Sequence, residues 1–306
     1  MSFGQNNKLF TWILIGLIPI GACAGILIGW AVFQGGGGDL NIQGSTTVEK
    51  IATGSAVPFM KGHPGVNVFV SGTGTGTGIG TLINQQCDVA MASRLVKNSE
   101  NSSAFNSTGL YLRSFAIAKD GLAVIVNDAA NSTLNLTILE IRSIFNGSIT
   151  SWSDPLLVSI GLTGSIQVVV REEGSGTRDA FNNLVMGDED QVVPYSKYVG
   201  DALSLSSNQN IFDEIESNDQ AIGYVGLGYI KDGIEAVTVD SIEPTVENVL
   251  NGSYIIQRDL YFVTLGYPES DSLVWEYVNW HLGLEGQYWV FAAGFININE
   301  KRDDYL

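Results

Sequence analysis

The chain has 306 residues, 45% of them hydrophobic, and a formal net charge of −17. Its length suggests about two domains, and its apolar content is ample for a sizeable core. So acidic a chain lacks the basic face of a general nucleic-acid binder, and it is unsuited to anionic lipid head groups.

An uncharged, apolar run extends from Phe10 to Phe33. A helix of this length can cross a bilayer of roughly 30 Å. Lys8 precedes the run and Asp39 follows it, so the positive-inside rule places the N-terminus in the cytoplasm. The sequence therefore predicts a cell-membrane protein with a single N-terminal transmembrane anchor at residues 10–33 and an extracytoplasmic soluble domain. Lipidation of Cys23 is an alternative, because the residues before it loosely resemble a lipobox.

Features beyond the anchor fit a location outside the cytoplasm. Residues 35–38 are all glycine and indicate a short flexible tether. Cys87 is the one cysteine outside the anchor, so the soluble part forms no internal disulfide, and we expect a buried, inert thiol. Acceptors for N-linked glycosylation, which fit an extracellular glycoprotein, occur at Asn101, Asn106, Asn131, Asn135, Asn146 and Asn251.

After the tether, short apolar segments alternate with segments of helical pattern. The pattern predicts strands at 40–43, 66–70, 88–92, 122–127, 166–171, 221–225 and 234–239. It predicts helices at 47–60, 78–86, 137–145, 177–186, 208–217, 271–282 and 285–292. Such alternation indicates α/β layers with a largely parallel sheet. In these sheets ligands bind beyond the carboxyl ends of the strands.

Glycine- and hydroxyl-rich stretches follow three of the predicted strands: GSTTV at 44–48, SGTGTGTGIGTL at 71–82 and REEGSGTRDAF at 171–181. Glycine lets the backbone approach a ligand closely, and a helix N-terminus presents unpaired N–H groups and a partial positive charge. None of the stretches is a P-loop, a dinucleotide fingerprint or a nucleophile elbow. Each alone could be a flexible turn-forming loop. Together with Arg171 and Arg178, they predict a pocket for a small oxyanion that needs no metal.

Little in the sequence indicates catalysis. His63 and His281 are the only histidines, and we expect both to be structural or exposed. No cluster with metal-ligand spacing is present. The sequence therefore predicts a binding protein rather than an enzyme, with no cofactor and no metal.

The order of the motifs resembles that in the substrate-binding protein of the Pst-type ABC phosphate importer. GSTTV and the glycine run are followed by CDVAMASRLVK at 87–97, REEGSGTRDAF, and AIGYVGLGYI at 221–230. The resemblance covers residues 40–295 approximately. It implies an α/β fold, a two-lobed type II periplasmic-binding-protein clamshell with mostly parallel sheets, preceded by the transmembrane helix.

In such a clamshell, lobe one would comprise residues 39–125 and 237–306, and lobe two residues 126–236. The lobes are expected to close on the ligand by a hinge, from an open, water-filled cleft. The resemblance implies that the ligand is inorganic phosphate and that the partners are the permease subunits of an ABC importer.

Carried over by position, the phosphate-binding residues of the family fall on Ser45, Thr46, Thr47, Thr75, Ser93, Arg94, Arg171, Ser175, Gly176 and Thr177. The hydroxyl residues could instead be helix N-caps, and the arginines could be surface ion-pair residues. Beside a hydroxyl-rich helix start, an arginine is better suited to a bidentate oxyanion. Arg178, which flanks the same stretch, is a candidate for contacting these binding residues rather than the ligand.

One departure from the family concerns Arg94. Some members carry an aspartate at this position, which accepts the proton of the ligand and so favours protonated phosphate over sulfate. Here the candidates for that acceptor are Glu172, Glu173 and Asp179, and Glu173 could instead orient Arg171. Sulfate or molybdate stays an alternative ligand, and adhesion or signalling at the cell surface stays an alternative function.

Overall fold

The computed structural model describes residues 37–129, 134–157, 162–187 and 196–298, all within the unit Gly35–Leu306. Its strands are β1 (Asp39–Gly44), β2 (Asn67–Gly72), β3 (Val89–Ala92), β4 (Leu112–Asn127), β5 (Asn135–Leu136), β6 (Gln167–Arg171), β7 (Leu203–Leu205), β8 (Ala221–Gly226), β9 (Ile234–Ala236), β10 (Thr238–Val239) and β11 (Gln257–Leu265). Its helices are α1 (Thr46–Gly62), α2 (Thr75–Ile83), α3 (Asn98–Thr108), α4 (Ile138–Phe145), α5 (Gly176–Phe181), η2 (Asn182–Met186), α6 (Asn208–Ser217), η3 (Leu227–Tyr229), α7 (Val246–Leu250), α8 (Leu273–Leu282) and α9 (Leu284–Ala292).

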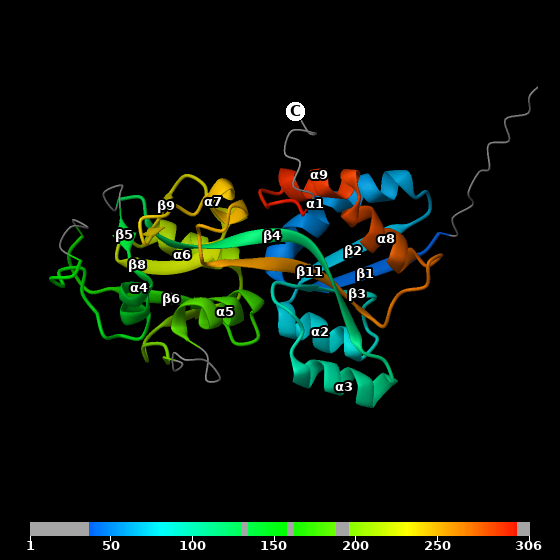
Figure 1. Ribbon diagram of the computed structural model, residues 1–306, viewed down its shortest axis with the longest axis horizontal. Helices are drawn as coiled ribbons and strands as arrows, with labels where there is room; N and C mark the ends of the chain where they lie inside the picture. Colours follow the sequence, from blue (N-terminus) through cyan, green and yellow to red (C-terminus); the bar gives the residue numbers. More distant parts are fainter. Residues whose placement is uncertain (1–36, 130–133, 158–161, 188–195, 299–306) are drawn as a thin grey trace, which may run out of the picture. The chain divides into compact units, whose positions relative to one another are not determined.

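One mixed sheet carries most of the described strands, in the order β2-β1-β3-β11-β4-β8-β6-β7, with β9 paired to β4 (Figure 1). β1 runs parallel to β2 and β3, and β6 runs parallel to β7 and β8. β4 and β11 are antiparallel to each other, and they join the two parallel groups through β8 and β3. The predicted α/β class with parallel pairing is therefore confirmed, and the two long antiparallel strands are an addition to it.

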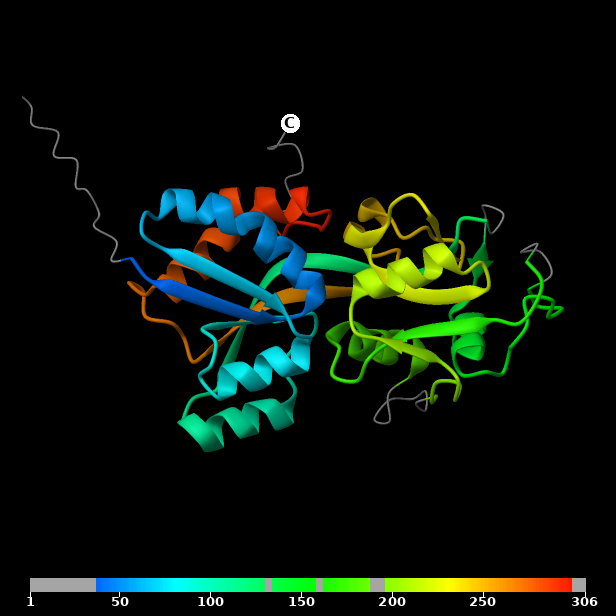
Figure 2. The same ribbon diagram turned by 180° about the vertical axis from the view of Figure 1, so that it is seen from behind.

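The core side chains lie on both faces of this sheet in separate clusters. Along β3, Val89 and Met91 pack with α1, α8 and α9, whereas Ala90 and Ala92 pack with α2 and α3. This follows from the strand geometry, because successive side chains point to opposite faces. Figure 2 shows these two groups of helices on either side of β1 to β3. A further cluster, which includes the fully buried Trp152, fills the space between α4, α5, α6 and the strands β4, β6 and β8.

Several predicted elements match the observed residue ranges closely, and α6 matches its predicted range. Other elements differ from the prediction in their bounds or in number. The predicted helix 177–186 divides into α5 and η2, and the predicted strand 234–239 divides into β9 and β10. Helix α3 was not predicted, because Ala104 is its one buried residue and no apolar stripe marks it. Its start is fixed locally instead: the Lys97 N–H donates to Glu100 Oε2 at 2.7 Å.

Other predictions from the sequence have different outcomes. Cys87 is buried and forms no disulfide, so the prediction of a buried thiol is confirmed, and burial raises the pKa of this thiol to about 12. The predicted anchor at residues 10–33, Cys23 and Asn131 lie outside the described residues. Within the described residues, no helix combines the length and the apolar character that crossing a membrane requires.

Candidate functional site

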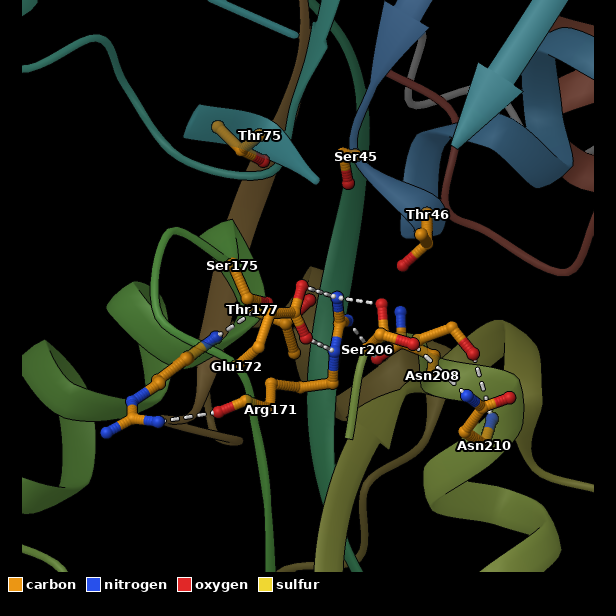
Figure 3. A network of polar contacts seen from close by, with 12 residues as sticks. Ser45, Thr46, Thr75, Arg171, Glu172, Ser175, Thr177, Ser206, Asn208 and Asn210 are labelled. Atoms are coloured by element: carbon orange, nitrogen blue, oxygen red, sulfur yellow. Dashed lines mark hydrogen bonds and ion pairs between the residues drawn. The ribbon is translucent and has the colours of Figure 1, made fainter. Parts of the chain in front are cut away.

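The three glycine- and hydroxyl-rich stretches meet at the carboxyl ends of β1, β2 and β6 (Figure 3). Thr47 Oγ1 at the start of α1 lies 3.1 Å from Thr177 Oγ1 in α5. A Cβ atom on Gly176 would lie 2.4 Å from Thr75 Oγ1 and 2.5 Å from Ser93 Oγ, so only glycine fits between these side chains. The segments that the sequence grouped by composition are thus brought together in space.

Glycines make this approach possible. Gly44, at the end of β1, has a φ of +138°. A Cβ atom added to Gly78 of α2 would lie 2.4 Å from the Cα atom of Gly44. The Gly74 N–H donates to the Gly44 carbonyl at 2.8 Å, and the Gly76 N–H donates to the Gly174 carbonyl at 3.0 Å. Helix α2 therefore packs directly against the backbone of both neighbouring loops, which side chains would prevent.

The start of α1 holds two hydroxyls with different roles. Ser45 Oγ caps the helix by accepting from the N–H groups of Thr47 and Val48, at 3.2 and 3.4 Å. Thr46 Oγ1 is buried and has no hydrogen-bond partner among the described residues. It points from α1 toward the side chains around Arg171 (Figure 3). Tyr229 donates to the Thr46 carbonyl at 2.6 Å, and burial raises the pKa of Tyr229 to about 12, so the hydroxyl stays protonated.

Hydroxyl groups also accept backbone N–H groups at the starts of α2 and α5. Ser93 at the end of β3 donates its N–H to Thr75 Oγ1 at 3.2 Å, and both side chains are buried. Ser175 Oγ caps α5 by accepting from the Arg178 N–H at 3.3 Å. Ser175 and Thr177 are both 1% exposed, so their hydroxyls lie inside the molecule.

Arg171 ends β6 at the centre of this cluster. Its Nε and NH2 groups donate to the two carboxylate oxygens of Glu172, at 2.9 and 2.8 Å, and NH1 donates to Asn208 Oδ1 at 3.2 Å. From behind, Arg178 NH1 donates to the Arg171 carbonyl at 2.8 Å. Arg171 is 1% exposed, so the expectation that it faces an open, water-filled cleft is wrong for this structure.

Thr47 connects the two sides of the site. It is fully buried, and its Oγ1 accepts from Asn208 Nδ2 at 2.7 Å and from Arg258 NH2 at 3.2 Å. These two donors occupy both lone pairs of the hydroxyl, so its own proton is directed to Thr177 Oγ1.

Arg258 and Asp120 form a buried ion pair that sequence reasoning missed. They are register partners on β11 and β4, and Arg258 donates from Nε and NH2 to Asp120 Oδ2, at 3.2 and 2.9 Å. Burial raises the pKa of Asp120, and the neighbouring Arg258 opposes this shift. The available signal was a charged residue within an otherwise apolar, strand-like run. Asn208, also missed, gave no such signal.

Arg94 is bonded to two acidic residues. Its Nε donates to Asp179 Oδ2 at 2.6 Å, and its NH1 and NH2 groups donate to the Glu100 carboxylate at 2.9 and 2.8 Å. Lys97 Nζ also lies 2.9 Å from Asp179 Oδ2. These ion pairs connect the segment after β3 with α5. Glu173 is exposed, so among the predicted carboxylates Glu172 is the one that contacts Arg171.

The arrangement suits a small oxyanion. It places hydroxyl groups, helix N-termini and the guanidinium groups of Arg171 and Arg258 within one buried cluster, where hydrogen bonds are stronger than in water. In the described parts of the chain, no group of histidine, cysteine and carboxylate side chains is arranged to hold a metal ion.

Comparisons with known proteins agree with this chemistry. A family model described as the PBP superfamily domain matches residues 31–283. A crystal structure from Clostridium perfringens, described as a phosphate ABC transporter substrate-binding protein with bound phosphate, is 30% identical, has a TM-score of 0.74, and is aligned over 85% of this chain and 100% of that one. An ABC-type phosphate transport receptor from Vibrio cholerae is 29% identical with a TM-score of 0.65 over the same shares. The phosphate-binding protein PstS of Borreliella burgdorferi is 27% identical over 85% of this chain and 90% of its own.

Proposed function

The chain belongs to the PBP superfamily, and we propose on this premise that it captures inorganic phosphate and delivers it to the permease subunits of an ABC importer. Relatives named for phosphate binding or phosphate transport align over most of this chain and of their own, which supports the proposal. The proposed role includes no catalytic step, no cofactor and no metal.

The single observation that carries the proposal is the Thr46 hydroxyl. Buried polar groups are nearly always hydrogen-bonded, yet Thr46 Oγ1 has no partner among the described residues. It stands at the N-terminus of the 17-residue helix α1, where the backbone favours an anion, and it points toward Arg171. An oxygen atom of phosphate would be the acceptor that this hydroxyl lacks.

We propose that the residues around Thr46 hold the phosphate together. The set comprises Ser45, Thr46, Thr47, Thr75, Ser93, Arg171, Ser175, Gly176 and Thr177. We place Arg94 outside this set, because Glu100 and Asp179 engage its guanidinium group. Glu172 is the proposed acceptor for the phosphate proton, since it lies against Arg171 and each of its oxygens keeps a further lone pair.

The proposed lobes are residues 39–125 with 237–306, and residues 126–236. The separate core clusters support a division into two lobes. Along β4 and β11, the boundary between these clusters lies near residues 120 and 257, and not at the proposed residues 125 and 237. Hydrogen bonds such as that between Thr47 and Thr177 would then form when the lobes close on the ligand.

We further propose that residues 10–33 anchor the chain in the cell membrane and that the binding domain lies on the extracytoplasmic side. The uncharged run and the preceding Lys8 support this orientation. N-terminal sequencing of the mature protein should begin at or near Met1. A mature chain that begins at Cys23 would show lipoprotein processing instead.

The proposed ligand is tested by calorimetric titration of the purified full-length chain with phosphate, sulfate and molybdate. Phosphate should bind much more tightly than the other two anions. A folded chain that shows no binding of phosphate would refute the proposal, and a preference for sulfate or molybdate would assign a different oxyanion. Delivery to an importer is tested in cells that lack the protein, where phosphate uptake should fall.

A further inference from the structure

The buried ion pair between Arg258 and Asp120 has a geometry that stability alone does not explain. Asp120 is fully buried, and the Arg258 side chain is 5% exposed. Removing two charges from water is costly, and hydrophobic residues of similar size are often at least as stabilising as a buried ion pair. A pair of this kind, next to a cluster of buried hydroxyls, therefore calls for another role.

The guanidinium group of Arg258 extends past its carboxylate partner. Nε and NH2 bond to the same oxygen of Asp120, and NH2 also donates to Thr47 Oγ1 at 3.2 Å. NH1 lies 3.5 Å from the Ser93 carbonyl. The outer edge of the guanidinium group is thus directed at the start of α1 and the end of β3, which both belong to the proposed phosphate site.

Asp120 holds this edge in place. Its second oxygen, Oδ1, accepts the Leu227 N–H at 3.0 Å, so the carboxylate is fixed from both sides. A Cβ at Gly226 would lie 2.6 Å from Asp120 Oδ2, so the neighbouring strand leaves room for this carboxylate only because it carries glycine there. These contacts orient the guanidinium group of Arg258 with NH2 toward Thr47 and NH1 toward the Ser93 carbonyl.

Arg171 and Arg258 approach Thr47 from different strands. Arg171 is held by Glu172 and reaches Thr47 through Asn208, whereas Arg258 is held by Asp120 and donates to Thr47 directly. We propose that Arg258 is a second arginine of the phosphate site and donates to the bound anion, and that Asp120 is its positioning residue. This inference rests on the proposed function, because it concerns the same site.

The simpler explanation is that Arg258 only neutralises Asp120. Calorimetric titration of the full-length chain with inorganic phosphate separates the two explanations. Arg258→Met should weaken phosphate binding by about 100-fold or more, since it removes charge-assisted hydrogen bonds. Because this variant leaves Asp120 unpaired and could unfold, the double variant Asp120→Asn with Arg258→Met is the decisive one. It restores charge balance, and phosphate affinity should stay about 100-fold below wild type.

Further variants serve as controls and as a second test. Arg113→Met changes an exposed arginine of β4 that lies over the Tyr267 ring, and it should bind phosphate like wild type. Arg258→Lys keeps the ion pair but not the planar fork, so a loss of about 10-fold is expected. Asp120→Asn keeps one acceptor for Arg258 but places an amide donor where Asp120 accepts, so it should lose less phosphate affinity than Asp120→Leu, which keeps no acceptor.

The outcomes are distinct. Phosphate binding by the double variant within about 3-fold of wild type would overturn the inference and leave Arg258 as a counterion only, since 3-fold is less than one hydrogen bond. If the double variant does not fold, the test is Arg258→Lys. Phosphate binding by Arg258→Lys with wild-type affinity would also overturn the inference. A wild-type chain that does not bind phosphate would refute the proposed function itself.

Discussion

Replacing Gly176 with alanine should weaken phosphate binding without disturbing the fold around it. The φ of Gly176 lies outside the left-handed range, so alanine fits the local backbone at the first residue of α5. The new methyl group would nevertheless lie 2.4 Å from Thr75 Oγ1, 2.5 Å from Ser93 Oγ and 3.0 Å from Thr75 Cβ. Thr75 and Ser93 are buried and bonded to each other, so neither side chain can move away freely.

The magnitude follows from the cost of overpacking. Inserting one methyl group into a well-packed interior costs about 1–3 kcal/mol, which corresponds to a loss of about 5-fold to 150-fold in phosphate affinity. The clash exists only when α5 meets the start of α2, so in the proposed clamshell the ligand-free chain would avoid it by opening. Unfolding of the ligand-free variant should therefore occur near the wild-type temperature.

The assay combines calorimetric phosphate titration with small-angle scattering of the full-length chain. Gly80→Ala is the matched control, because it adds a methyl group to α2, the helix that Gly176 of α5 contacts, at a position where nothing lies within 4 Å. Wild type and Gly80→Ala should become more compact with saturating phosphate, and Gly176→Ala should not. Wild-type affinity and normal compaction in Gly176→Ala would refute the idea that these loops meet around the ligand.

Other variants test the charges of the site and of the core. Arg171→Ala should lose about 100-fold to 1,000-fold in phosphate affinity by calorimetry, and Arg171→Lys should recover only part of it because an ammonium group lacks the planar fork; near-native binding by Arg171→Ala would place the anion elsewhere. Glu172→Gln should narrow the preference for phosphate over sulfate in competition titrations, since the amide can donate to a fully ionised oxygen, and an unchanged preference would assign the proton acceptor elsewhere. Burial lowers the pKa of His281 from 6.5 to about 4, so the unfolded chain binds a proton that the folded chain does not, and stability is lost as the pH falls through that window. Between pH 7 and pH 4.5 the stability difference between wild type and His281→Gln, from urea unfolding, should shrink by roughly 2–3 kcal/mol, whereas a constant difference would contradict the shift.

The parts of the site that sequence reasoning found are those determined locally. Ser45 caps α1 and Ser175 caps α5, and the glycines beside them are needed for close backbone approach. Such features depend on a few adjacent residues, so their composition and order identify them. That the three stretches meet follows from their common position after parallel strands.

The parts that it missed depend on contacts across the chain. Asp120 and Arg258 are 138 positions apart, and they meet only because β4 and β11 pair in one register. Neither β11 nor the first part of β4 was predicted, since charged residues interrupt their apolar pattern. Arg94 shows the converse, because a motif assigned it to the ligand while its nearest partners are Glu100 and Asp179.

A net charge of −17 on the whole chain is compatible with an anion site, because binding of the anion depends on the donors that contact it and not on the net charge of the protein. Arg171 is paired with Glu172, and Arg258 is paired with Asp120, so each guanidinium group already carries a neutralising partner. Exposed acidic residues farther than about 8–10 Å away are screened at ordinary salt. What remains is a set of donors fixed at hydrogen-bond distance in a buried environment, where each contact is stronger than in water. In the proposed site the carboxylates orient the arginines and offset their charge, so that recognition would depend on how well the oxygens and the proton of the ligand match the donors and acceptors around Thr47.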